Sequence, residues 1–216
     1  MQRKRADVIR EYGPFPGVDR VHGVTFDGHH VWFASTDQLH ALDPDSGEIV
    51  RTFAIAARAG TAFDGRHLYQ IAEGLIHKID LANGKLLKTI PAPDGPGLDS
   101  GLAWAEGTLW VGEYRGHRIH QIDPETGALL RTLESDRFVT GVTWSDGELW
   151  HATAQDDASE VRRIDPATGE VLERIDMPEG STVSGLEAGG RERFFCGGGG
   201  SGKIRAIRRG RTRTRT

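Results

Sequence analysis

The chain has 216 residues, of which 27 % are charged, and a formal net charge of -4 at pH 7. This charge balance gives no reason to expect nucleic acid as a partner, and no apolar run approaches membrane-spanning length. The single cysteine excludes an intramolecular disulfide and is compatible with a reducing compartment, so a cytoplasmic location is expected.

The first segment with strand character is DVIREY, residues 7–12, which has the make-up of later segments that each close a repeat. Five glycines open units of similar sequence, spaced 37 to 44 residues apart: Gly23, Gly60, Gly101, Gly141 and Gly185. A period near 40 residues with several strands per unit is typical of a β-propeller.

Each unit predicts a four-stranded blade. Its first two apolar runs are mostly separated by Asp-Gly or Glu-Gly, which favours a tight hairpin turn. A third run alternates apolar and polar residues, and a turn such as DPETG or DPATG then reverses the chain into a fourth strand. Large aromatic residues recur at one position of the second strand, and we expect them to pack one blade against the next: Trp32, Tyr69, Trp110, Trp150 and Phe195.

The last unit ends at KIRAIRR and lacks both the aspartate turn and a fourth strand. Residues 7–12 fit the missing place, which would close the ring across the two ends of the chain. We therefore predict an all-β fold, a five-bladed β-propeller that forms a single domain over residues 1–209. The basic, low-complexity residues 210–216 are predicted to be a disordered tail.

The candidate site follows from this topology, because the start of the first strand and the end of the second lie at the same end of each blade. Polar residues there should ring the mouth of the central channel. His22, Glu113 and His151 are the candidate metal ligands, since two imidazoles and a carboxylate suit a divalent metal ion with an open position. Alternatively, the histidines are hydrogen-bonded channel residues, or Glu73, Glu113 or Asp99 form a calcium site.

Further residues at this end suit catalysis and substrate binding. The candidate catalytic residues are Glu73 or Glu187 as general base, together with His151. The candidate substrate-binding residues are Ser100, Thr140, Ser184, Tyr114 and Arg115. A divalent ion (Zn, Mn, Fe, Ni or Ca) is the candidate cofactor. No nucleotide cofactor is expected, because Lys203 in CGGGGSGK is followed by Ile204 and not by Ser or Thr.

The repeats DGHHVWFASTDQLHALDPDSGEIVRTF and AEGTLWVGEYRGHRIHQIDPETGALLRTL resemble those of two propeller groups, over residues 6 to about 208. The resemblance to glutaminyl-peptide cyclotransferases implies five blades and a metal-associated channel. The resemblance to the streptogramin lyase and gluconolactonase-like superfamily implies a channel ion that supports ring opening or hydrolysis. Glu187 loosely matches a late carboxylate of the cyclotransferases. Those enzymes carry Gln or Glu just before blade-opening glycines, where this chain has His22, Ala59, Ser100, Thr140 and Ser184.

Two functions follow as hypotheses. The first is a small-molecule enzyme of lyase, hydrolase or cyclotransferase type that acts at the channel mouth. The second is a non-catalytic propeller that binds a ligand or a protein partner on the same face. The concentration of polar residues at one end of a compact domain favours the enzyme.

Overall fold

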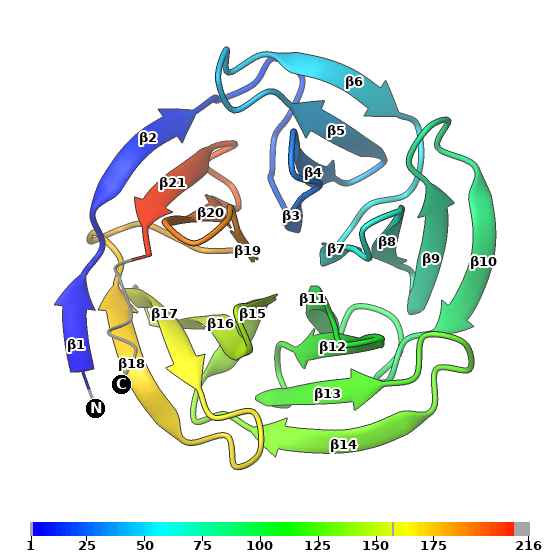
Figure 1. The fold of residues 1–216 in the computed structure, drawn as a ribbon. Helices are drawn as coiled ribbons and strands as arrows, with labels where there is room; N and C mark the ends of the chain where they lie inside the picture. Colours follow the sequence, from blue (N-terminus) through cyan, green and yellow to red (C-terminus); the bar gives the residue numbers. More distant parts are fainter. Residues whose placement is uncertain (1, 157, 210–216) are drawn as a thin grey trace.

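A computed structural model describes residues 2–156 and 158–209 of the chain. Every regular element in these residues is a β-strand, and five sheets stand in a ring around one axis (Figure 1). The predicted five-bladed β-propeller is confirmed. Among the described residues, none forms a helix long and apolar enough to cross a membrane. The predicted tail, residues 210–216, lies outside the described residues.

The first three blades are continuous in sequence, and each runs from the axis outward in chain order. Blade 1 consists of β3 (Val24–Phe26), β4 (Val31–Ser35), β5 (Gln38–Leu42) and β6 (Ile49–Phe53). Blade 2 consists of β7 (Thr61–Phe63), β8 (His67–Ala72), β9 (Leu75–Asp80) and β10 (Leu86–Pro91). Blade 3 consists of β11 (Asp99–Ala105), β12 (Thr108–Glu113), β13 (Arg118–Ile122) and β14 (Leu129–Glu134).

The fifth blade is completed by the N-terminal segment, as the sequence predicted. It consists of β19 (Gly185–Ala188), β20 (Arg193–Gly197), β21 (Ile204–Arg208) and β2 (Val8–Tyr12). Strand β2 runs antiparallel to β21, with Tyr12 opposite Ile204 and Val8 opposite Ile207. The ring is therefore closed by hydrogen bonds between the two ends of the chain, which leaves no gap between the last blade and the first (Figure 1).

Blade 4 carries one strand more than the repeat predicts. After β15 (Phe138–Ser145), β16 (Glu148–Gln155), β17 (Ala158–Ile164) and β18 (Val171–Asp176) comes β1 (Gln2–Arg5), parallel to β18. The basic side chains of β1 meet acidic ones of β18: Arg3 Nε lies 2.8 Å from Asp176, and Lys4 Nζ lies 2.5 Å from Glu173. The sequence did not predict this strand, because QRKR has no apolar alternation.

Aromatic side chains pack neighbouring blades together, which confirms the sequence expectation for most of them. Tyr69 stacks on Trp104 of the next blade, with ring centroids 5.4 Å apart. In the same way Trp110 meets Trp144 at 6.0 Å. Trp32 of blade 1 stacks on Phe53 of its own blade at 5.2 Å and shares a buried cluster with Leu68 and Ile79 of blade 2. These buried rings provide a large share of the apolar surface between the blades.

The axis of the ring is narrow where the innermost strands begin. The five glycines that open the blades line it, and the space between them does not admit a water molecule. A Cβ atom on Gly141 would lie 2.6 Å from the backbone nitrogen of Leu186 in the next blade. Such closeness explains why the repeat requires glycine here. The glycines therefore separate the mouth end of the axis from the opposite end.

Candidate functional site

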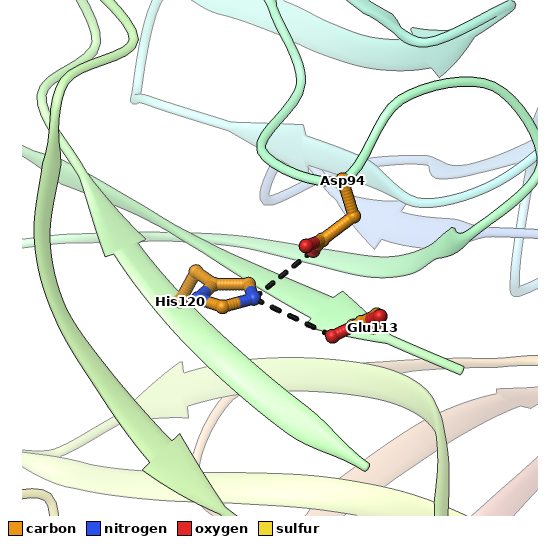
Figure 2. Close-up of side chains that lie close together, drawn as sticks. All are labelled: Asp94, Glu113 and His120. Atoms are coloured by element: carbon orange, nitrogen blue, oxygen red, sulfur yellow. Dashed lines mark ion pairs between the residues drawn. The ribbon is translucent and has the colours of Figure 1, made fainter. Parts of the chain in front are cut away.

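A buried group of two carboxylates and one imidazole lies at the mouth end of blade 3. Asp94 belongs to the loop that leads from β10 to β11, Glu113 is the last residue of β12, and His120 lies within β13. Figure 2 shows the imidazole of His120 directed at both carboxylates. Its Nε2 atom is 3.0 Å from Oδ2 of Asp94 and 3.7 Å from Oε2 of Glu113.

The imidazole is held from its other side as well. Nδ1 of His120 is 2.9 Å from the hydroxyl of Thr132 on β14. The side chains of His120 and Glu113 are almost completely buried, with residue exposures of 3 % and 4 %. Nε2 of His120 makes no aligned hydrogen bond among the described residues, and its polar neighbours are the carboxylates of Asp94 and Glu113.

Two more charged residues complete the group. Arg118, which is partly exposed, places Nε 2.6 Å from Oε2 of Glu113. Asp99 begins β11 and is the register partner of Glu113, which puts the two side chains on one face of the sheet. Burial, followed by the negative charges of Asp94 and Glu113, raises the pKa of Asp99 to about 7. Asp99 is only 7 % exposed, and neither of its carboxylate oxygens has a hydrogen-bond partner within the described residues.

A comparison of the blades separates what the repeat requires from what blade 3 adds. Blades 1 and 2 contain the same pair of third-strand histidine and fourth-strand threonine: His40 Nδ1 is 2.9 Å from Thr52, and His77 Nδ1 is 3.1 Å from Thr89. In blade 1, however, Nε2 of His40 meets a hydroxyl, that of Ser35 at 2.8 Å. The histidine is thus part of the repeated framework. In blade 2 the charge of Glu73 acts on His77, whereas in blade 3 two carboxylates lie within 3.7 Å of Nε2 of His120.

The position of Asp99 shows the same contrast. Three of the other four blades have a buried valine at this place, namely Val21, Val139 and Val183. An ionisable group in a site built for valine is costly to bury without a partner. Blade 3 therefore carries a carboxyl group that the framework does not require.

The loop between β12 and β13 covers the group from one side. Gly116 in this loop has no side chain, and a Cβ there would overlap the carboxylate of Glu113. Tyr114 in the same loop is exposed and stacks on Phe138, with centroids 4.7 Å apart, and Arg115 is exposed beside it. These two predicted substrate-binding residues therefore lie at the rim of the site, and their role stays a prediction.

The predicted metal ligands are not brought together, and this part of the sequence analysis requires correction. Across residues 2–156 and 158–209, the group of potential ligands that lie close to one another is Asp94, Glu113 and His120. Glu113 belongs to it, but His22 and His151 do not. The prediction placed His151 after the end of the second strand, but β16 continues to Gln155, so His151 lies inside the strand, and His22 precedes β3 of another blade.

His151 illustrates this point. It is almost fully buried on β16, opposite Arg162 of β17, and its Nδ1 has no hydrogen-bond partner. Burial, with a smaller contribution from the positive charge of Arg162, lowers the pKa of His151 to about 3. His22 is half-buried, and burial followed by the charges of Arg20 and Arg58 lowers its pKa too.

Two of the three predicted substrate-binding hydroxyl groups donate hydrogen bonds to the backbone. Ser100 donates to the carbonyls of Gly112 at 3.0 Å and Val139 at 2.6 Å, and Ser184 donates to the carbonyl of Val21 at 2.6 Å. The hydroxyl of Thr140 is buried and has no partner within the described part of the chain. A substrate-binding role for the three residues stays a prediction, but two of the hydroxyls already serve to join strands and blades.

The two predicted general bases lie in different places. Glu73 is exposed in the turn after β8, with a φ of 56°. Glu187 lies on β19 beyond the glycines, away from the mouth, and accepts hydrogen bonds from Thr25 at 3.0 Å and Thr143 at 2.9 Å. Burial raises the pKa of Glu187 to about 7, against the effect of these two hydroxyls.

Sequence reasoning missed Asp94, Arg118 and His120. The repeat itself contained a signal, because the third strands of blades 1 to 3 share one histidine position, at His40, His77 and His120. Only blade 3 combines that histidine with an acidic residue at the end of the second strand. The contribution of Asp94 could not be read from the repeat, because it comes from a connecting loop.

These features define a class of protein, a five-bladed β-propeller with a buried carboxylate and histidine group at one end of one blade. The chain belongs to the family described as outer membrane protein assembly factor BamB, whose family model matches residues 72–215. No curated protein matches the sequence.

Solved structures share the fold at low sequence identity. The chain is similar to the glutaminyl cyclase of Myxococcus xanthus, with a TM-score of 0.79 and 22 % identity, over 96 % of this chain and 97 % of that one. It is also similar to the hydrazine synthase of Kuenenia stuttgartiensis, with a TM-score of 0.53 and 18 % identity, over 83 % of this chain and 56 % of that one. At these identities the likeness shows the fold alone.

Proposed function

We propose that the protein is a small-molecule enzyme of hydrolase, lyase or cyclotransferase type, with its reaction centre at Asp94, Glu113 and His120. The observation that carries this proposal is the fixed imidazole of His120, whose Nε2 faces two carboxylates without a hydrogen-bond partner. A pre-oriented imidazole of this kind suits proton transfer. The fold shared with a glutaminyl cyclase supports an enzyme, although it does not identify a substrate.

In this scheme each residue has a separate task. Thr132 holds Nδ1 of His120, so that Nε2 keeps its direction when a proton is taken up or released. The carboxylates of Asp94 and Glu113 lie 3.0 and 3.7 Å from Nε2 and can accept or return the proton that the imidazole transfers. Arg118 is the partly exposed cation of the group, and its guanidinium can bind an oxygen that gains negative charge during the reaction.

A non-catalytic propeller that binds a ligand on the same face is the second candidate. The observation in its favour is the deep burial of the group, because a substrate must displace the Tyr114 loop or the Arg118 side chain to reach His120. Binding without turnover would require no such access to the imidazole.

The proposal is tested with a matched pair of variants, His120→Gln and His40→Gln. Both remove a buried third-strand histidine that meets a threonine, but only His120 faces carboxylates. The parent protein is assayed against N-terminal glutaminyl peptides, lactones and esters. We expect turnover of one class that His120→Gln lowers by at least about 100-fold and His40→Gln leaves within about twofold. Equal loss in both variants, or no turnover of any class, contradicts the proposal.

A further inference from the structure

We propose that Asp94, Glu113 and His120 bind one divalent transition-metal ion, Mn²⁺ or Zn²⁺, with the carboxyl group of Asp99 nearby. The inference concerns the site of the proposed function but gives Nε2 of His120 a different role, because a nitrogen that binds a metal ion cannot also take up a proton. It is tested by measuring metal binding alone, so that the result does not depend on whether the protein turns over a substrate.

The separations of the ligand atoms suit a single ion. Metal–ligand distances of about 2.0 to 2.2 Å place the ligand atoms around one ion about 3 to 4.4 Å apart. Nε2 of His120 lies 3.0 Å from the Asp94 carboxylate and 3.7 Å from that of Glu113. The chosen atoms of these three residues all lie within 4.8 Å of one another. An ion can therefore enter with small adjustments of the side chains and without a preformed cavity.

The site carries more acidic than basic side chains, which favours the binding of a cation. The partly exposed guanidinium of Arg118 lies 2.6 Å from Glu113 and 4.0 Å from Asp94, and the carboxyl group of Asp99 forms no ion pair within the described residues. The Asp99 oxygens are buried beside Glu113 and lack any hydrogen-bond partner in the described ranges. Buried carboxylates that remain unpaired are strongly unfavourable, and a divalent ion would compensate the surplus.

Asp99 is an observation independent of the acidic cluster. The equivalent position holds a buried valine in three other blades, so the blade forms without a polar residue there. A carboxyl group at this place, on the same face as Glu113, adds negative charge beside the three ligand atoms that converge.

The surroundings of His120 also match a metal ligand. A metal-bound imidazole usually has its other nitrogen hydrogen-bonded, which sets the orientation of the ring. Thr132 takes this place at Nδ1. His40 has the same arrangement through Thr52, but its Nε2 meets the hydroxyl of Ser35 and no carboxylate. The comparison predicts metal binding in blade 3 and none at the blade 1 histidine.

The donor set favours a transition metal. Imidazole suits Zn²⁺ and similar ions, while carboxylates also suit Mn²⁺, so a mixed set of one nitrogen and several oxygens selects among these. Calcium prefers six to eight oxygen ligands, and the imidazole nitrogen does not serve it. This composition separates the site from the oxygen-only calcium alternative.

The test uses the full chain after dialysis against a chelator and then into chelator-free buffer. Isothermal titration with ZnCl₂ or MnCl₂, and elemental analysis after gel filtration, measure stoichiometry and affinity. We expect one ion per chain, with affinity lowered at least about 100-fold in His120→Gln and unchanged in His40→Gln. Asp99→Val, the residue of other blades, is a second variant that preserves the fold and is expected to weaken binding by at least about 10-fold.

Two results would overturn the inference. One is the absence of saturable binding of either ion to the folded parent protein. The other is equal affinity in the parent, His120→Gln and Asp99→Val proteins, which would place the ion elsewhere. Stoichiometric binding without turnover of any substrate leaves the metal site intact and refutes the proposed enzyme. Turnover by metal-free protein that binds no added ion would support the proposed enzyme and refute the metal site.

Discussion

Glu187 gives the protein a pH-dependent stability that a single substitution should remove. Its side chain lies beyond the glycines that close the axis and accepts hydrogen bonds from Thr25 and Thr143. Burial raises its pKa from 4.5 to about 7. The native state therefore favours the protonated carboxyl group, and the associated stability is complete below pH 4.5 and is lost as the pH rises through 7.

The size of this effect follows from the pKa shift. At about 1.4 kcal/mol per pKa unit, the shift corresponds to at most about 3 kcal/mol between the two limits, because solvent reaches part of the Glu187 residue. We expect Glu187→Gln to keep a neutral, hydrogen-bonded group at every pH. The variant should then lie within about 1 kcal/mol of the parent at pH 5 and exceed its free energy of unfolding by about 2 to 3 kcal/mol at pH 8.

Urea unfolding followed by tryptophan fluorescence, at intervals from pH 5 to 8.5, measures the difference between the two proteins. Carboxylates elsewhere affect both proteins equally and cancel in that difference. Glu170→Gln, a change of an exposed glutamate, serves as the control and should show no such pH dependence. A constant difference between parent and Glu187→Gln across this range would refute the reasoning that burial dominates at Glu187.

Three other substitutions test the site and the closure of the ring. Asp99→Val should raise the free energy of unfolding of the metal-free protein by about 1 to 3 kcal/mol, because it removes an unpaired buried carboxyl group. Urea titrations measure this difference, and a variant less stable than the parent would contradict the prediction. Gly116→Ala should displace the Glu113 carboxylate and weaken Zn²⁺ binding while the circular dichroism spectrum stays that of the parent; unchanged affinity would show that the loop can adjust. Tyr12→Ala should lower the free energy of unfolding by about 3 to 5 kcal/mol, because the Tyr12 ring packs on Phe195 and its hydroxyl donates to the carbonyl of Pro44. A decrease below about 1 kcal/mol in urea unfolding would mean that the closing strand contributes little to stability.

The sequence by itself determined the architecture of the ring. The spacing of Gly23, Gly60 and the later blade-opening glycines set the number of blades, and the missing last strand after KIRAIRR indicated closure by residues 7–12. These features can be read locally, because strand alternation and turn residues depend on near neighbours in the chain. The strand β1 escaped prediction because its pairing with β18 depends on charge complementarity across the fold.

Only the tertiary structure decided which side chains meet. Glu113 was predicted as a metal ligand, and its neighbours are Asp94, Asp99 and His120 and not the histidines at positions 22 and 151. Membership of this group depends on which face of a strand a side chain occupies and on the path of the loop before β11, and neither follows from the repeat. The repeat fixes the backbone of every blade alike, whereas the chemistry arises where one blade departs from that pattern.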